Sequence, residues 1–365
     1  MSEYAVHKRV ESQVPDSGDS VCIVLEYPTT TESRLNKINT GGIQQVLNPM
    51  CKFAGINAQT VMLTHAIQLK PAQENPQNFF HKRSEYKKLK KETEWRSQFV
   101  PTQYGYLKEE YEQDIKRLKD EINKYNPTII IAMGNISLWS LYGLDKVGSY
   151  RGSFLEADSE WATRPYKIMP TYSPLSIIKN YSFRPTVAAD LKKAVSAKDN
   201  IEIEHTEREI LIEPTLQEVD EFLTECELLN NADNPLSFDI ETAFGEITCI
   251  GFAPNKKRAM VVPFKTEDSK DYWDYSNELL VWDRIKRTLS NPNVTKVAQN
   301  QTYDISWLRH KYKIEVKGTV HDTMHAQHSL QPEMEKSLGY LGSIYTNEGA
   351  WKNLTSFSKS TKAEE

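Results

Sequence analysis

The feature that most constrains the fold is an alternation, in the first half of the chain, of short apolar runs with segments of helical periodicity. Runs such as TIIIAMG (residues 128–134) are apolar almost throughout, as in strands buried on both faces of a parallel sheet. Segments such as residues 106–127 repeat apolar positions at helical spacing. The alternation predicts an α/β domain with helices on both faces of a mainly parallel sheet. We expect further strands at residues 20–28, 60–69 and 166–174, and a further helix at 41–56.

Length and composition narrow the class of protein. At 365 residues the chain is too long for one ordinary domain, so two are expected. With 45 Lys and Arg against 50 Asp and Glu, it lacks the uniform basic charge of a histone-type binder, and DNA contacts must come from local patches. No apolar run is long enough to span a bilayer, so we expect no membrane association and a cytoplasmic protein, in the host cytoplasm if a phage encodes it.

The cysteines exclude several kinds of site. They are isolated in the sequence, without C-x-x-C pairs, which argues against a zinc ribbon, an iron–sulfur cluster or a disulfide framework. We expect small buried side chains in a reducing compartment. The four residues are Cys22, Cys51, Cys226 and Cys249.

A charged, weakly periodic segment at residues 196–209 marks the predicted domain boundary. Beyond it, a helix at 216–229 precedes three consecutive strands between residues 235 and 264, then a helix, a short strand and another helix up to residue 312. This order predicts a second α/β unit with a mixed sheet. We expect a disordered tail at 1–19, a first domain at 20–197, a second domain at 205–352 and a polar tail at 353–365.

Three acidic residues are the main candidates for chemistry. Asp239 and Glu241 share one face of a predicted strand, because side chains two apart point the same way. Asp304 falls in the first turn of the helix that follows another strand. Each of these residues also has a simpler explanation. Acidic residues of a strand can face water, Asn300 could cap the helix, and Asp304 could be stabilised by the positive end of the helix. Each alternative explains only part of the set. Converging carboxylates repel each other without cations between them, so the set predicts two Mg²⁺ or Mn²⁺ ions that support phosphodiester hydrolysis.

The segments SFDIET, NQTYDISWL and HDTMHAQHSLQPEMEKSLGYLGSIYT together resemble two motifs and the connecting region of a known nuclease domain. This is the proofreading 3'→5' exonuclease domain of family A DNA polymerases, of the ribonuclease-H-like DEDD superfamily, most closely that of tailed bacteriophages. The resemblance implies that Asp239, Glu241 and Asp304 are catalytic metal ligands and that Asn300 and Tyr303 are motif flanks. It implies a single-stranded 3' end or primer–template DNA as substrate. In that family the Asp that matches Asp322 is not a ligand.

The third motif of that family has no counterpart. It consists of a Tyr followed four residues later by an Asp, but no Asp follows Asp322, and Gly349 stands four residues after Tyr345. We therefore expect this chain to be the amino-terminal portion of a polymerase, with weak or no nuclease activity alone. A polymerase domain or subunit that carries the third motif is the expected partner.

The first half resembles the uracil-DNA glycosylase superfamily, especially its iron–sulfur class, over residues 20–195. The segments that carry the resemblance are IVLEYPTTTE, VMLTHAIQLKPA, IIIAMGNISLWSLYG, YRGSF and IMPTYSPLSIIKN, in this order. The resemblance implies a three-layer α/β/α fold in which Glu26 matches the acidic residue that handles the attacking water. His65 replaces the uracil-reading Asn, and Ser173 replaces the His that stabilises the departing base. The cluster cysteines are missing, so we expect no iron–sulfur cluster and a degenerate pocket.

A basic insert, FFHKRSEYKKLKKETEWR (79–96), interleaves cations with aromatic residues. Such mixing suits phosphate contacts and base stacking, whereas a solvated helix with a lysine face is the alternative. The DNA-binding candidates are Lys82, Arg83, Lys87, Lys88, Lys90 and Lys91, with Phe79, Phe80, Tyr86 and Trp95 as the aromatic residues.

The sequence as a whole favours a proofreading 3'→5' exonuclease module of a phage-type family A DNA polymerase. One alternative is a non-catalytic DNA-binding or assembly module of a split polymerase. The other is a divergent uracil-DNA glycosylase.

Overall fold

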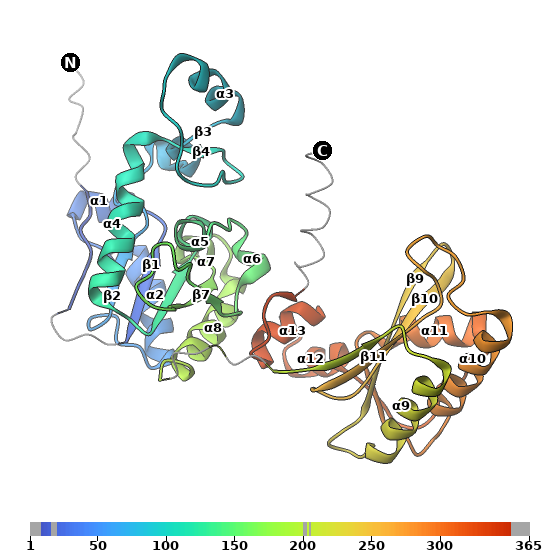
Figure 1. Cartoon of the computed structure of the whole chain (residues 1–365). Coiled ribbons are helices and arrows are strands. Elements are labelled where there is room, and N and C mark those ends of the chain that lie inside the picture. The colour runs from blue at the N-terminus through green and yellow to red at the C-terminus, as the bar shows by residue number, and fades with distance from the viewer. Residues whose placement is uncertain (1–8, 16–19, 200–202, 204–205, 352–365) are drawn as a thin grey trace. The chain divides into compact units, whose positions relative to one another are not determined.

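The computed structural model describes residues 9–15, 20–199, 203 and 206–351, which divide into two compact units (Figure 1). The first unit contains Met1–Glu204 and Gly339–Glu365, and the second contains His205–Leu338. The predicted polar tail at 353–365 lies outside the described residues. Within the described part of the chain, no helix combines the length and the apolar character that a membrane crossing requires.

A five-stranded sheet of order β2-β1-β5-β7-β6 forms the centre of the first unit. Its strands are β1 (Val21–Leu25), β2 (Met62–His65), β5 (Ile129–Met133), β7 (Lys167–Thr171) and β6 (Leu155–Glu156). All pairs are parallel except that of β6 with β7, which is antiparallel. Every side chain of β1 and β5 is buried, which confirms strands covered on both faces.

Two hydrophobic cores lie on opposite faces of this sheet. Alternate residues of β1 enter different cores, Ile23 with helices α2 (Gly42–Ala54) and α8 (Arg184–Ser196), and Val24 with α4 (Glu109–Tyr125) and α5 (Asn135–Tyr142). The predicted α/β/α sandwich is thereby confirmed. Smaller helices complete the body of the unit: α1 (Thr30–Leu35), η1 (Ala72–Glu74), η2 (Pro76–Phe79), α6 (Val147–Tyr150), α7 (Pro174–Lys179) and η3 (Tyr181–Phe183).

The predicted disordered tail at residues 1–19 was wrong for the part that the structure describes. Val10 is fully buried, and Gln13 forms an antiparallel bridge to Leu63 of β2, with N–O distances of 2.8 and 3.0 Å. A segment without sequence periodicity can still pair with the open edge of a sheet, where unpaired backbone groups are available.

The second unit is built on a six-stranded mixed sheet of order β13-β12-β9-β10-β11-β8. Its strands are β8 (Glu209–Ile212), β9 (Leu236–Ala243), β10 (Glu246–Asn255), β11 (Arg258–Pro263), β12 (Lys296–Ala298) and β13 (Val320–Asp322). Strands β9, β10 and β11 are antiparallel, whereas β12 runs parallel to β9 and β13, and β8 runs parallel to β11. The mixed sheet is as predicted. Its helices are α9 (Leu216–Leu229), α10 (Tyr275–Leu289), α11 (Gln301–Tyr312) and α12 (Thr323–Leu330).

Helix α13 (Leu338–Tyr345) follows the second unit in sequence, but its residues from Gly339 on belong to the first. The Tyr340 hydroxyl lies 2.9 Å from Thr186 Oγ1, and Arg151 Nη1 donates to Ser343 Oγ at 2.7 Å. The guanidinium of Arg151 also lies over the Tyr340 ring. The second unit therefore ends earlier than the predicted limit of residue 352, because polar contacts hold α13 to the first unit.

We predict that Asp190→Ala destabilises the first unit by about 3–5 kcal/mol, because Arg151, its buried partner, would keep an uncompensated charge. Asp190 also accepts a hydrogen bond from Thr171 Oγ1 at 2.6 Å. Urea unfolding with hydrogen exchange of the β5 and β7 amides would measure the loss. Asp120→Ala, at an exposed position of α4, serves as the matched control, and equal stability of the two variants would contradict the assigned role.

Candidate active site

Strand β9 presents the first two carboxylates of the candidate site. Phe238 and Ile240 are buried, whereas Asp239 and Glu241 are exposed, so the strand separates an apolar face from an acidic one. This confirms the strand and the alternation predicted from the sequence. The apolar face joins the core of the second unit, together with residues of α9 and α10.

Helix α11 places the third carboxylate against the same strand. β12 runs parallel to β9, and α11 begins shortly after β12 ends. Asp304 is 3% exposed, and its Oδ1 accepts a hydrogen bond of 2.9 Å from the backbone N–H of Ile240. Ile240 is the residue between Asp239 and Glu241. The structure therefore brings Asp304 to the short segment of β9 that carries the other two acids.

The electrostatics of Asp304 reflect this neighbourhood. Burial raises the pKa of Asp304 to about 6; the hydrogen bond from Ile240 opposes that rise, and the charges of Asp239 and Glu241 add to it. The direction means that burial and the two neighbouring carboxylates disfavour the charged form of Asp304, which positive charge nearby would favour. A divalent cation would supply that charge, and carboxylate oxygens are the ligands that Mg²⁺ and Mn²⁺ accept, so the donor set fits such ions.

The acidic side chains nevertheless do not form a closed ligand cluster. Among the described residues, no group of three or more His, Cys, Asp or Glu side chains is gathered closely enough to hold a metal ion. Asp304 directs one oxygen to the Ile240 N–H, while Asp239 and Glu241 are exposed. Mutual repulsion of like charges favours such a spread. The predicted residues share one region, and their role as metal ligands stays a prediction.

Asp322, which the family resemblance leaves out of the ligand set, organises the start of α11. Its two carboxylate oxygens accept hydrogen bonds from the backbone N–H groups of Asn300 and Gln301, at 3.1 and 2.9 Å. Although burial opposes it, these bonds and two more from the first turn of α12 hold the pKa of Asp322 below its ordinary value. Asn300 is the N-cap residue of α11, as one alternative from the sequence allowed, but its side chain makes no capping hydrogen bond. An Asp just before a helix could have indicated the role of Asp322.

Tyr303, the other predicted motif flank, links α11 to β9 through its hydroxyl group. The Tyr303 Oη lies 2.6 Å from Thr242 Oγ1, and 46% of the residue is exposed. Its ring is also tilted against Trp307, with the ring centroids 6.3 Å apart. Tyr303, one residue from Asp304, is therefore anchored at its hydroxyl group and half-exposed.

The first unit has a separate cavity at the carboxyl ends of β1, β5 and β7. It has a volume of about 510 Å³, and its lining includes Glu26, Gly134 and Ser173. The Glu26 Oε1 accepts a hydrogen bond from the Ile136 N–H, at the amino end of α5, at 3.1 Å. Gly134 has a φ of 107°, which strongly favours glycine, and a Cβ there would lie 2.3 Å from Glu26 Cδ and would displace the Glu26 side chain. Burial raises the pKa of Glu26, although hydrogen bonds that include one from Ser173 oppose the rise.

His65 lies away from the lining of this cavity, and its predicted match to the uracil-reading position stays a prediction. It is 1% exposed and is not among the residues that line the cavity. Its Nε2 lies instead 3.7 Å from Oε1 of Glu32, a buried residue of α1. The end of β2 therefore turns this side chain toward α1.

Together, these features define an α/β protein with a glycosylase-like domain followed by a nuclease-like domain. A family model for the uracil DNA glycosylase superfamily matches residues 12–195, and one described as 3'-5' exonuclease matches residues 215–362. The first match spans half of the chain, which belongs to the uracil DNA glycosylase superfamily and carries a 3'-5' exonuclease domain after the glycosylase domain. No curated protein matches the chain.

Solved structures similar to the chain include three exonucleases. Escherichia coli RNase D, an exoribonuclease involved in structured RNA processing, is 12% identical with a TM-score of 0.29, over 39% of this chain and 34% of that one. Trypanosoma brucei RNase D in complex with GMP is 14% identical with a TM-score of 0.33, over 42% and 46%. The EXD2 exonuclease domain soaked in Mg and dGMP is 15% identical with a TM-score of 0.25, over 37% and 68%. The chain spans about a third of the length of E. coli RNase D, and likeness at these TM-scores carries no argument about the site.

We predict that Asp304→Asn stabilises the metal-free second unit at pH 7 by up to about 3 kcal/mol. The raised pKa of Asp304 means that the folded state holds the proton more tightly than the unfolded state. The carboxylate therefore destabilises the fold as the pH rises from about 4 to about 6, whereas the amide keeps the acceptor for Ile240 and does not titrate.

Urea unfolding of both proteins in EDTA at several pH values would test this. The gain of Asp304→Asn should shrink toward zero below pH 4, where the acid is neutral in both states. The exposed Asp268→Asn, also in the second unit, is the control. Parallel stability curves for wild type and Asp304→Asn would refute the prediction.

Proposed function

We propose that the second unit removes nucleotides from the 3' end of a DNA strand, as the proofreading module of a phage-type family A DNA polymerase. The observation that carries the proposal is the hydrogen bond from the Ile240 N–H to Asp304, which brings a third carboxylate to the two of β9. The match to a 3'-5' exonuclease family over residues 215–362 supports the same reaction. The raised pKa of Asp304, near two other carboxylates, supports the binding of cations at this position.

Each residue has a distinct task in the proposed mechanism. Asp239, Glu241 and Asp304 would hold two divalent cations, which activate a water and stabilise the leaving oxygen of the phosphodiester when bound. The Ile240 N–H orients the Asp304 carboxylate through its hydrogen bond to Oδ1. Asp322 positions the start of α11 through the backbone of Asn300 and Gln301. Tyr303, anchored on Thr242, would contact the terminal nucleotide.

The proposed partner is a polymerase domain or subunit that supplies the missing third motif. No Asp follows Asp322 in this sequence, and a catalytic unit that lacks one component commonly loses orders of magnitude in rate. The chain alone would thus hold cations and DNA but cleave slowly. If the chain alone does not cleave at all, it corresponds to the alternative of a non-catalytic DNA-binding or assembly module.

We predict that Mn²⁺ binds the isolated chain and that Asp239→Asn weakens this binding by about tenfold or more, because affinity for hard cations depends on ligand charge. Titration calorimetry would measure the affinities, with the exposed Asp268→Asn as control. In parallel, a 5'-labelled single strand with Mg²⁺ should be shortened slowly by wild type and not by Asp239→Asn. Rapid shortening by the wild-type chain would show that the third motif is dispensable, and shortening that survives Asp239→Asn would refute the carboxylate site.

A second candidate function is base excision by the first unit, favoured by the position of Glu26 in a cavity at the strand ends. The environment of Glu26 resembles that of an acid able to handle a water molecule, since burial raises its pKa. Against this candidate, Ser173 occupies the position of the His that stabilises a departing base in the family, and His65, at the position of the uracil-reading Asn, lies 3.7 Å from Glu32.

We predict no detectable release of uracil from uracil-containing DNA, because Ser173 stands where the resemblance places the His that stabilises the departing base, and a serine hydroxyl cannot carry positive charge. Alkaline cleavage of abasic sites after incubation with the chain would measure release. Release that disappears in Glu26→Gln would establish excision by this cavity. Release unchanged by Glu26→Gln would indicate that another group performs it.

A further inference from the structure

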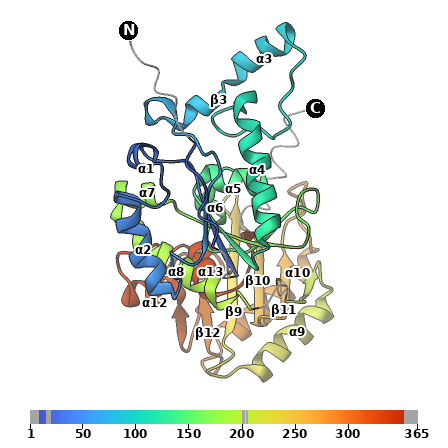
Figure 2. The ribbon, with the colours of Figure 1, turned by 90° about the vertical axis from the view of Figure 1, so that its left-hand side faces the viewer.

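The first unit carries an arm, residues 80–107, that stands clear of the α/β/α body (Figures 1 and 2). It consists of helix α3 (Arg83–Glu92) and a two-stranded sheet of β3 (Phe80–His81) and β4 (Tyr106–Leu107). None of the chemistry proposed above uses it. The arm contains all six basic residues predicted to bind DNA.

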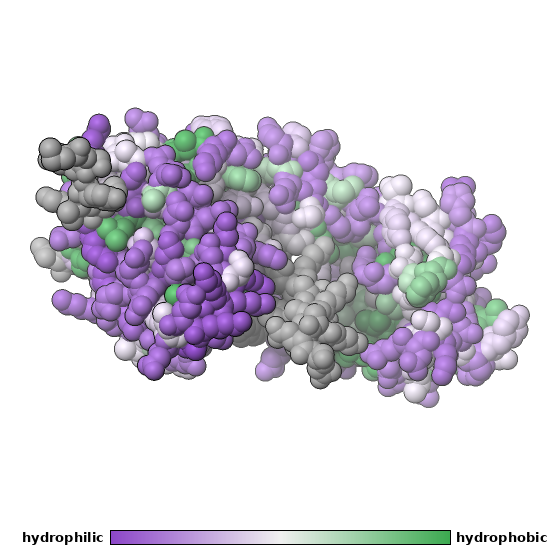
Figure 3. All heavy atoms as spheres, turned by 90° about the horizontal axis from the view of Figure 1, so that it is seen from above, coloured by the Kyte–Doolittle hydropathy of each residue, from purple (hydrophilic) through white to green (hydrophobic). Residues whose placement is uncertain are grey.

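Basic residues occupy one face of α3. Arg83, Lys87, Lys90 and Lys91 have the spacing i, i+4, i+7 and i+8, which places them on one side of a helix, and none of the four is buried. Seen from above, the arm shows a strongly hydrophilic surface (Figure 3). Of the other two candidates, Lys82 precedes the helix as its N-cap residue, and Lys88 lies 3.8 Å from Glu92.

Most of the aromatic residues of the insert serve packing: Phe79 and Phe80 join a core of the body, and Tyr86 packs within the arm. Phe79, Phe80 and Tyr86 are buried, so their predicted use in base stacking was wrong. Tyr86 stacks on Tyr106 with ring centroids 3.8 Å apart. Trp95 is half-buried and meets the Tyr86 ring edge-on at 5.6 Å. Trp95 is therefore the aromatic residue of the insert that retains an accessible surface for a ligand.

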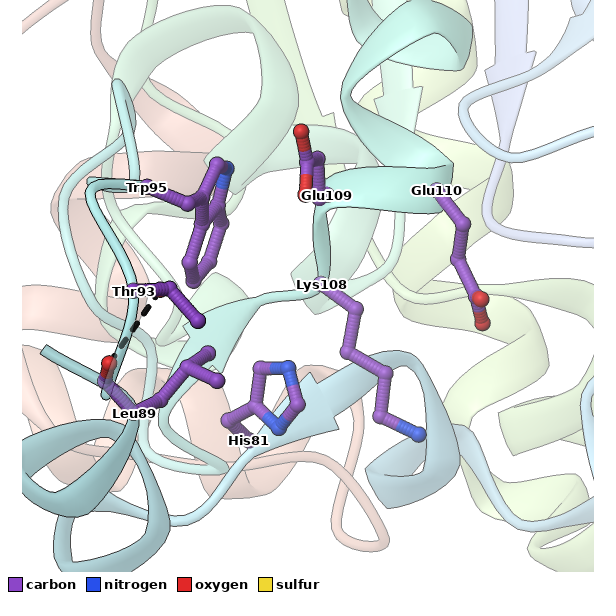
Figure 4. Close-up of a pocket in the computed structure, with 7 residues that line it drawn as sticks. All are labelled: His81, Leu89, Thr93, Trp95, Lys108, Glu109 and Glu110. Carbon is purple, nitrogen blue, oxygen red and sulfur yellow. Dashed lines mark hydrogen bonds between the residues drawn. The ribbon is translucent and has the colours of Figure 1, made fainter.

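Trp95 lines a cleft beside α3 with a volume of about 590 Å³ (Figure 4). Its aromatic and apolar lining comprises His81, Leu89 and Trp95, and the centroids of the two rings lie 6.0 Å apart. Burial and then the charge of Lys108 lower the pKa of His81, so the imidazole is neutral at pH 7. The cleft thus offers flat, uncharged ring surfaces next to a cationic helix.

We propose that the arm binds single-stranded nucleic acid, with the backbone phosphates along the basic face of α3 and one unstacked base in the cleft. Lys108, Glu109 and Glu110 also line the cleft, so its charged residues do not favour a phosphate overall, and the two carboxylates can accept hydrogen bonds from base amino groups. A single strand is the matching partner because its bases expose faces for stacking, which a duplex hides. This surface lies in a different unit from the carboxylates of β9, so it is a second nucleic-acid contact that does not depend on the proposed nuclease function.

The phosphate contacts predict a change in salt dependence. Binding of a labelled 20-nucleotide single strand to the full chain in EDTA would be followed by fluorescence anisotropy at several salt concentrations. The variant Arg83→Gln, Lys87→Gln, Lys90→Gln, Lys91→Gln should bind at least about tenfold more weakly at low salt. Its slope of log affinity against log salt should become shallower by about 0.7 for each phosphate group that the variant no longer neutralises.

A matched control removes four lysines of the first unit outside the arm: Lys37, Lys52, Lys116 and Lys192, each changed to Gln. Control binding close to wild type supports the proposal. An equal loss of affinity in both variants, or an unchanged slope in the arm variant, would overturn it and leave α3 as a solvated face.

The base contact has its own test in Trp95→Leu, which keeps an apolar side chain but removes the stacking surface. Single-strand affinity should fall about tenfold at an unchanged salt slope. Because Trp95 also packs on Tyr86, circular dichroism must show an intact fold, and quenching of a 2-aminopurine base by the wild-type chain gives an independent reading. Equal affinity for duplex and single strand, or no quenching at any position, would overturn base insertion.

Discussion

The hydrogen bond from the Ile240 N–H to Asp304 is the contact on which the candidate active site depends. It joins an amide in the middle of β9 to the first turn of α11, elements more than sixty residues apart in sequence. Without it, the buried Asp304 carboxylate would lose the β9 amide that donates to it and that holds it near Asp239 and Glu241. The same contact places Asp304 where burial raises its pKa. The ionised carboxylate therefore lowers the stability of the fold at the position proposed for the chemistry.

Strands and helices with a clear periodicity of apolar residues could be predicted from the sequence, whereas elements without such a pattern were missed. The fully apolar β1 and β5 and the amphipathic α4 and α9 were predicted nearly to their ends. β13 has only three residues and β8 lies at a sheet edge with most side chains exposed, so neither has a recognisable pattern. The docking of α13 could not be predicted, because it rests on contacts between residues about 150 to 190 positions apart.

The positions of the candidate site residues could be predicted only in part. The face shared by Asp239 and Glu241 follows from the two-residue period of a strand, and the position of Asp304 follows from a strand-to-helix junction. His65 also stands at a strand end, but sequence position does not say toward which neighbour a side chain turns, and here the neighbour is Glu32. The aromatic residues of the insert were misjudged for the same reason. Tyr86 stands among basic residues in the sequence, as a base-stacking residue would, but its side chain is buried.

Helix α13 bears directly on how the proposed nuclease could be completed. In the family that the second unit resembles, the third motif lies downstream of the connecting region that ends near this helix. Tyr340 and Ser343 of α13 are buried in the first unit, and Lys193 donates to the backbone carbonyl of Ser343 at 2.9 Å. These residues therefore take part in the packing of the first unit. No Asp follows Asp322 in this sequence, so the proposed function assigns the completing Tyr and Asp to the polymerase partner.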